Sequence, residues 1–218
     1  TGKALYASDV RLPRMLSATL VQSPVFGGKV AAVDDAAARA IAGVHSVVRF
    51  DDWVGVIADT FWHALQGARA LKISWTEGEF AAVSQADISK RFAEAAQTPG
   101  VRVRTEGDAA QALATAAKKI DAVYEVPYLA QTPMEPLSCV AQIEGNRCKL
   151  WAGTQRQSHT AQRVAQTLGM NLADIEIETT QLGGGLGRRF AEDFVVQAAL
   201  LARTTAGRPV KLLWTREE

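Results

Sequence analysis

A glycine-rich turn followed by two arginines, Gly183–Arg189, constrains the fold of this chain more than any other stretch. It follows residues 175–180, whose alternating apolar and polar side chains predict a half-buried strand. Apolar residues recur at helical spacing over 190–205 and predict a helix directly after it. This order brings bare backbone N–H groups to a helix N-terminus, where the helix dipole and the arginines favour an anion or a polar cofactor. The simpler alternative is that the glycines only allow a sharp turn.

The spacing excludes two common nucleotide-binding loops. A phosphate-binding P-loop needs Gly-x4-Gly-Lys-Ser/Thr, and no Lys-Ser/Thr pair follows these glycines. A dinucleotide fingerprint that starts at Gly183 would place its third glycine at position 188, which is an arginine. We therefore expect a ligand-binding loop of another type.

Composition narrows the class of protein. The chain has 218 residues, which suits one large domain or two small ones, and its 48% hydrophobic content is ordinary for a globular protein. A net charge of +1 argues against broad binding of nucleic acid. No apolar run reaches the length of a membrane span. Because the chain opens on Thr1 without a signal peptide, we expect a piece of a longer protein.

Cysteine and histidine are too few and too scattered for a protein-bound metal. Cys139 and Cys148 lack C-x-x-C spacing, and His45, His63 and His159 form no paired motif. A structural zinc ion or an iron–sulfur cluster needs about four such ligands. We expect both cysteines to be buried or half-buried strand residues and the histidines to be structural.

The order of the predicted elements indicates an α+β protein with two units. Strands and helices alternate over residues 1–80, a connection spans 81–105, and a second unit spans 106–218. Strands are predicted at 16–21, 29–33, 44–50, 54–58, 72–75, 122–126, 136–143, 148–154, 175–180 and 210–214. Helices are predicted after Asp34-Asp35 and after Asp59-Thr60, and at 87–97, 108–119, 158–168 and 190–205.

Seven short segments, in this order, resemble the xanthine oxidase/aldehyde oxidase family of molybdenum enzymes. They are residues 1–13, 23–24, 56–60, 134–136 (Met-Glu-Pro), 153–155 (Gly-Thr-Gln), 183–187 and 207–211. The abbreviated first unit and the double arginine most resemble the β-subunit type of isoquinoline 1-oxidoreductase, which includes membrane-associated aldehyde dehydrogenases. The resemblance implies that 1–80 is an α/β hammerhead domain and that 106–218 is the N-terminal part of a molybdenum-cofactor-binding domain.

The resemblance also implies the site residues. Gln155 matches the glutamine whose amide hydrogen-bonds an oxygen ligand of the molybdenum, and Leu186-Gly187 matches a Phe-Gly pair that borders the metal. Gly184, Gly185 and Arg188 are expected to bind the cofactor with them. In this family a pterin, here expected in its cytosine dinucleotide form, holds the molybdenum, so no protein ligand to the metal is expected.

The implied parent protein is a molybdenum hydroxylase large subunit that oxidises an N-heteroaromatic compound or an aldehyde, with water as the oxygen source. Its iron–sulfur clusters are expected on a small partner subunit. The catalytic base is expected beyond Glu218, so this chain alone should hold no catalytic residue and be inactive. Glu135 is expected to be a structural carboxylate that accepts backbone hydrogen bonds.

Two other functions stay open at this point. The chain could be a non-catalytic module whose arginine-bearing loop binds phosphate or a nucleotide. It could also be a structural docking fragment, in which the glycines serve only to allow close packing. The compartment also stays open between bacterial cytoplasm, periplasm and a membrane-associated location.

Overall fold

The computed structural model describes residues 2–217, which divide into two compact units. Unit 1 comprises the chain up to Ala81 and again from Gln131 onward, and unit 2 comprises Ala82–Ala130. The predicted boundaries at 80 and 105 therefore do not both coincide with compact units, because residues 106–130 group with the connection.

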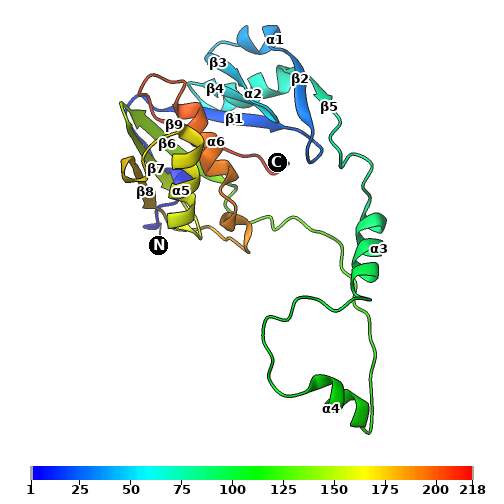
Figure 1. Ribbon diagram of the computed structural model, residues 1–218. Helices are drawn as coiled ribbons and strands as arrows, with labels where there is room; N and C mark the ends of the chain where they lie inside the picture. Colours follow the sequence, from blue (N-terminus) through cyan, green and yellow to red (C-terminus); the bar gives the residue numbers. More distant parts are fainter. Residues whose placement is uncertain (1, 218) are drawn as a thin grey trace. The chain divides into compact units, whose positions relative to one another are not determined.

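One seven-stranded sheet forms the centre of unit 1 (Figure 1). In spatial order its strands are β3 (Val44–Arg49), β4 (Trp53–Ala58), β1 (Leu16–Gln22), β9 (Val210–Leu213), β6 (Ser138–Glu144), β7 (Arg147–Ala152) and β8 (Ile175–Thr179). β1 and β9 pair in parallel, with Leu16 opposite Val210. This pairing joins the first 80 residues to the last 80 in a single hydrogen-bonded sheet.

Helices cover both faces of the sheet. Along β4, a Cβ atom on Gly55 would meet Leu201 of α6 (Asp193–Ala202), whereas Val56 contacts Gly67 of α2 (Phe61–Ala70). Because successive strand residues point to opposite faces, α6 and α2 lie on opposite sides. α5 (Gln157–Leu168) packs beside α6, as Figure 1 shows. Fully buried apolar side chains between the sheet and α6 form the main core, including Leu20, Leu150, Phe194, Leu201 and Leu212.

Shorter elements complete unit 1. They are a two-stranded antiparallel sheet of β2 (Lys29–Asp34) and β5 (Lys72–Thr76), the helix α1 (Ala36–Arg39), and the 3-10 turns η1 (Ala7–Asp9), η2 (Leu172–Asp174) and η3 (Arg188–Phe190).

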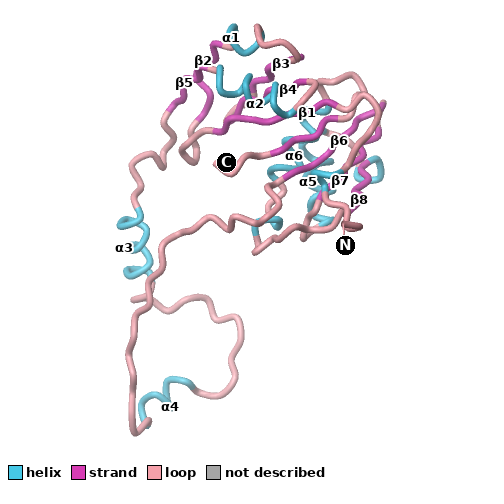
Figure 2. The backbone as a smooth tube through the Cα atoms, turned by 180° about the vertical axis from the view of Figure 1, so that it is seen from behind, coloured by secondary structure: helices cyan, strands magenta, loops and turns pink. Residues whose placement is uncertain are grey.

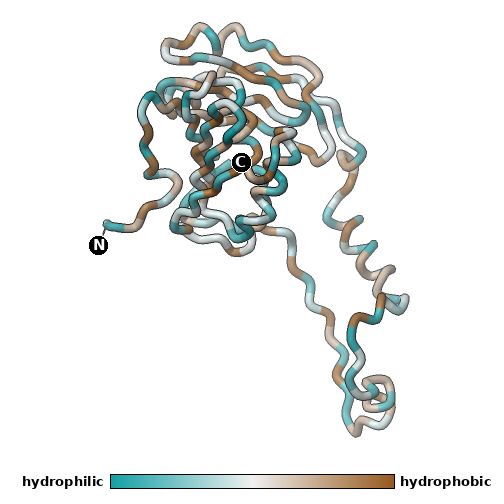
Figure 3. Tube along the Cα trace, turned by 60° about the vertical axis from the view of Figure 1, so that its left-hand side comes forward, coloured by the Kyte–Doolittle hydropathy of each residue, from teal (hydrophilic) through white to brown (hydrophobic). Residues whose placement is uncertain are grey.

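Unit 2 contains two helices in otherwise extended chain (Figure 2). α3 (Gln85–Ala95) begins with a capping box between Ser84 and Asp87, and α4 (Ala109–Thr115) begins at Asp108, whose carboxylate accepts a hydrogen bond from a first-turn amide. None of residues 82–130, all of which the structure describes, is buried. Several residues of this segment are nevertheless apolar and exposed, and Figure 3 colours such positions of the trace brown.

The structure corrects several predictions from periodicity. No strand forms at 122–126, because its alternating apolar residues have no neighbouring strand to pair with. The predicted helix at 108–119 ends at Thr115. The predicted helix at 190–205 begins at Asp193, and Phe190, expected on its buried face, is 50% exposed in η3. Among residues 2–217, no helix is long and apolar enough to cross a membrane.

Candidate functional site

Gln155 and the glycine loop meet at one edge of the sheet. Gln155 follows β7 and the loop follows β8, and these strands are parallel neighbours, so their carboxyl ends lie side by side. A Cβ atom on Gly185 would lie 2.7 Å from Gln155 Oε1, which places the amide directly over the loop. The backbone N–H of Gln155 donates to the carbonyl of Arg189 at 3.1 Å. Of the predicted site residues, Gln155 therefore lies against the loop at Gly185, although 30 positions separate the two.

Four carbonyl groups of the loop, at residues 183, 184, 185 and 187, are hydrogen-bonded within the protein. They accept hydrogen bonds from the backbone N–H of Glu135 (to Gly183), Nε of Arg189 (to Gly184), the N–H of Arg188 (to Gly185) and the N–H of Phe190 (to Gly187). The N–H groups of residues 184–187, in contrast, have no recorded acceptor within residues 2–217. Four consecutive amides thus remain available to an external acceptor, as in backbone nests that bind anions.

The loop requires left-handed backbone at three positions. Gly184 and Gly187 have φ of 99° and 87°, which glycine adopts without steric cost. Leu186 has φ of 50°, and its side chain is 73% exposed at the tip of the loop. Because a leucine rarely adopts left-handed backbone, Leu186 indicates local backbone strain at the tip of the glycine loop.

Arg189, which is fully buried, fixes the loop from below. Its guanidinium donates to the carbonyls of Gly184 (2.7 Å), Gly153 (3.3 Å) and Glu135 (2.9 Å), and to Glu135 Oε2 at 2.9 Å. Burial lowers the pKa of Arg189, and the Glu135 carboxylate opposes that shift. One side chain therefore holds together the chain before β6, the end of β7 and the glycine loop.

Glu135 completes this arrangement. Its side chain is 8% exposed, and Oε2 accepts the backbone N–H of Gly183 at 3.0 Å while Oε1 accepts the hydroxyl of Ser138 at 3.2 Å. The prediction of a structural carboxylate that accepts a backbone hydrogen bond is confirmed. Sequence reasoning did not identify its partner, since paired arginines do not reveal which of the two is buried.

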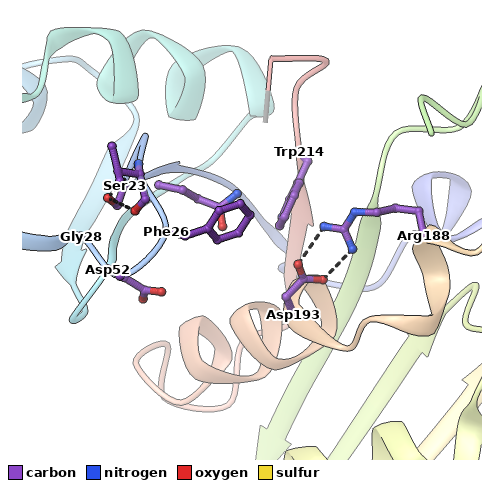
Figure 4. A pocket seen from close by; sticks show the side chains of 10 residues that line it. Ser23, Phe26, Gly28, Asp52, Arg188, Asp193 and Trp214 are labelled. Carbon is purple, nitrogen blue, oxygen red and sulfur yellow. Dashed lines mark hydrogen bonds and ion pairs between the residues drawn. The ribbon is translucent and has the colours of Figure 1, made fainter. Parts of the chain in front are cut away.

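Arg188 lies differently from the prediction. Its guanidinium forms a bidentate ion pair with the Asp193 carboxylate, with N–O distances of 3.1 and 2.8 Å (Figure 4). It also lies over the ring of Trp214, 5.1 Å from the ring centre. The charge expected to favour an anion is thus paired. The helix N-terminus also lies farther from the glycines than predicted, because α6 begins at Asp193, six residues beyond Gly187. The Asp193 carboxylate accepts a hydrogen bond from the backbone N–H of Phe194 in the first turn.

Arg188 and Asp193 border a cavity of about 390 Å³. Its other walls are the loop between β1 and β2 (residues 22–28), Asp52 and Trp214. Figure 4 shows the Phe26 ring on the side facing Trp214. Phe26 is 90% exposed, so an apolar surface stands at the mouth of this cavity.

The cysteines lie on β6 and β7, as predicted. Cys139 and Cys148 are buried free thiols, and burial raises the pKa of Cys139 well above its usual value and that of Cys148 to about 12. Both are protonated at neutral pH and unsuited to bind a metal. Within residues 2–217, no group of three His, Cys, Asp or Glu side chains could hold a metal ion.

The donor set suits an oxygen-rich or anionic group that brings its own metal ligands. Gln155 is exposed, and its side-chain amide has no recorded hydrogen bond to residues 2–217. It faces the same loop as the four unused amides, and glycine at 185 leaves the space that a Cβ atom would fill. These groups can donate hydrogen bonds without supplying charge or coordination.

Comparison with known proteins agrees with this chemistry. Residues 89–218 match the family described as the molybdopterin cofactor-binding domain. Over its whole length the chain is 31% identical to the membrane-bound aldehyde dehydrogenase [pyrroloquinoline-quinone] of Gluconacetobacter polyoxogenes and 30% identical to isoquinoline 1-oxidoreductase subunit beta of Brevundimonas diminuta. It spans 29% of the length of each.

The fold has a counterpart among solved structures. An aldehyde oxidoreductase from Desulfovibrio gigas superposes on this chain with a TM-score of 0.71, over 98% of this chain and 29% of that one, with 19% sequence identity. That likeness confirms the mixed α+β fold.

Proposed function

The chain belongs to the molybdopterin cofactor-binding domain family, and from that membership we propose that it forms part of the large subunit of a molybdenum-dependent oxidoreductase. The observation that carries the proposal is the contact between Gln155 and a loop whose carbonyls at 183, 184, 185 and 187 accept hydrogen bonds within the protein, while its amides at 184–187 have no recorded acceptor within residues 2–217. Such an arrangement suits a group that needs hydrogen-bond donors and no protein ligands.

Each residue of the site has a defined task in this proposal. Gln155 donates its amide N–H to an oxygen of the cofactor and orients it, while the amides of 184–187 donate to the same group. Glu135 and Arg189 hold the loop in place and touch neither cofactor nor substrate. When bound, the molybdenum–pterin group supplies the two-electron redox chemistry. The structure favours this reading over phosphate capture by Arg188, since that guanidinium is paired with Asp193.

The substrate is proposed to be an N-heteroaromatic compound or an aldehyde, oxidised with water as the oxygen source. The names of the two relatives support these two classes. Leu186 at the loop tip and the Phe26 ring supply apolar surface for such a molecule. The pterin is proposed to be the cytosine dinucleotide form, with iron–sulfur clusters on a small partner subunit that removes the electrons.

Gln155→Ala tests the proposal in the full-length protein with its small subunit. We expect turnover to fall at least tenfold, with the urea midpoint unchanged, because Gln155 is exposed and its side chain bonds to no described residue. Gln162→Ala, at an exposed position on α5, is the matched control and should retain full turnover. Full turnover in Gln155→Ala would instead support a structural docking role. Turnover that depends on added pyrroloquinoline quinone, the cofactor in the name of one relative, would also refute the assignment.

A further inference from the structure

Unit 1 holds a second cavity, of about 490 Å³, on the opposite face of the sheet from α6. Val210 and Leu212 enter the core against α6, so Lys211 and Leu213 point to the other face. These two residues and Ser17, which pairs with Lys211 across β1 and β9, form the floor. The N-terminal segment 8–15 lines one wall, and residues 59–61 at the start of α2 line the other.

Lys211 is only 3% exposed, although lysine is almost never fully buried without a partner of opposite charge. Its ammonium donates to the backbone carbonyl of Ser8 at 2.6 Å. An ammonium group carries three donors, and no other acceptor for it is recorded within residues 2–217. Burial, and then the nearby Arg11, lower the pKa of Lys211 to about 8, while Asp9 opposes the shift. The buried cation therefore lacks a sufficient counter-charge.

Two arginines add to the positive charge of this cavity. Arg11 donates to the carbonyls of Ser8 and Val10, and neither Arg11 nor Arg14 forms an ion pair with any residue that the structure describes. Asp59 is the one carboxylate in the lining, and His63 Nδ1 pairs with it at 2.6 Å. Three cationic side chains thus line the cavity with one carboxylate, which already has a partner, and the nearby Asp9 carboxylate accepts the backbone N–H of Tyr6.

We propose that this cavity binds a small oxyanion, either a phosphate group or a carboxylate, held by Lys211, Arg11 and Arg14. The ammonium supplies the two unused donors, and the arginines supply forked donors that match the oxygens of such an anion. The volume exceeds that of inorganic phosphate and admits an organic group that carries the anion. The site is separate from the glycine loop and does not depend on the function proposed above.

Calorimetric titration of the chain with inorganic phosphate, at fixed ionic strength and pH 7, tests the site. We expect saturable binding in the wild type and at least tenfold weaker binding in Lys211→Met and Arg14→Gln. Lys72→Met, which removes an exposed lysine on β5, is the control and should bind as the wild type does. A parallel titration with acetate distinguishes a phosphate site from a carboxylate site. Absence of saturation with both anions, or unchanged binding in Lys211→Met, would overturn the proposal.

A measurement on the wild type keeps the test valid if a variant fails to fold. Acetylation of Lys211 at pH 8, followed by mass spectrometry, should slow several-fold when phosphate replaces chloride at equal ionic strength. Acetylation of Lys72 should proceed at the same rate in both salts. Equal protection of the two lysines, or none, would contradict a specific site at Lys211.

Discussion

Arg189 shows how a single residue sets the geometry of the candidate site. It is fully buried, and its guanidinium joins three segments, the most distant of which lies 54 positions before Arg189 in the chain. A buried ion pair contributes less to stability than its contacts suggest, because both charges lose their water. Removing one partner is costly, however, because the other then remains buried without a counter-charge.

Arg189→Met should therefore strongly destabilise unit 1. We expect a loss of about 3–5 kcal/mol in the free energy of unfolding, measured by urea titration, because Glu135 stays buried without its partner. The double variant Glu135→Gln/Arg189→Met should recover part of that loss. Arg163→Met on the exposed face of α5 serves as control and should change the free energy by less than about 0.5 kcal/mol. An Arg189→Met protein as stable as the control would show that the pair does not hold the loop.

Lys211 gives the chain a pH-dependent stability of defined sign. Its folded pKa of about 8 lies below the ordinary 10.5, so between these values the unfolded chain binds more protons than the folded chain. Stability contributed by this residue rises with pH across that window. Unfolding of the wild type and of Lys211→Met, compared at pH 7.5 and pH 10, should show the wild type gaining up to about 3 kcal/mol relative to the variant. Titration of the two buried cysteines affects both proteins equally, so it cancels in the difference between wild type and variant. A difference in the free energy of unfolding that does not change with pH would contradict a lowered pKa of Lys211.

At the scale of elements, two glycines of the same loop have different roles: Gly183 contacts a residue that supports the site, and Gly185 contacts a residue that forms it. Gly183 lies against Glu135, where an added Cβ atom would come within 2.4 Å of the Glu135 Cβ atom. Gly185 lies against the flexible end of Gln155. The same substitution at these two glycines should therefore have different consequences.

Gly185→Ala should displace the Gln155 amide and leave the fold intact. We expect bound molybdenum and turnover of the full-length protein to fall together, with less than about 1 kcal/mol lost in the free energy of unfolding. Gly183→Ala should cost about 1–3 kcal/mol, because the glutamate backbone must move. Gly100→Ala is the control, since an added Cβ atom there meets nothing within 4 Å. If Gly185→Ala retained its molybdenum, Gln155 and the loop would not act on one ligand.

Periodicity predicted most elements of unit 1, and the misses have physical causes. β1 and β8 follow from local alternation, β4 follows from a short apolar run, and α5 ends at Gly169, which adopts the left-handed conformation with φ of 65°. The strand predicted at 122–126 failed because strand formation needs a partner, which no local pattern reveals. The contact of Gln155 with the loop could be expected from the family resemblance, whereas the burial of Arg189 and the pairing of Arg188 depend on long-range contacts.

At the scale of the whole molecule, the sheet depends on both ends of unit 1. β1 is hydrogen-bonded to β4 on one side and to β9 on the other, and Gly55 of β4 packs against Leu201 of α6. The predicted hammerhead domain at 1–80 therefore shares its core with residues that follow position 137. Unit 2 contributes no buried residue of its own.

A fragment of residues 1–80 should consequently fail to fold alone. We expect its urea transition, followed by circular dichroism, to lack cooperativity, because the face of β1 and β4 beneath α6 becomes exposed to water. The chain with residues 82–130 replaced by a flexible linker is the counterpart and should unfold cooperatively. A cooperative transition in the 1–80 fragment would show that it is an independent domain.

The molybdenum and pterin content of the purified full-length protein tests the central claim most directly. Metal analysis and pterin release, each expressed per polypeptide, should give one molybdenum and one pterin for the wild type and a clear loss of both for Gly185→Ala. A folded protein that oxidises its substrate while it holds neither molybdenum nor pterin would contradict the account.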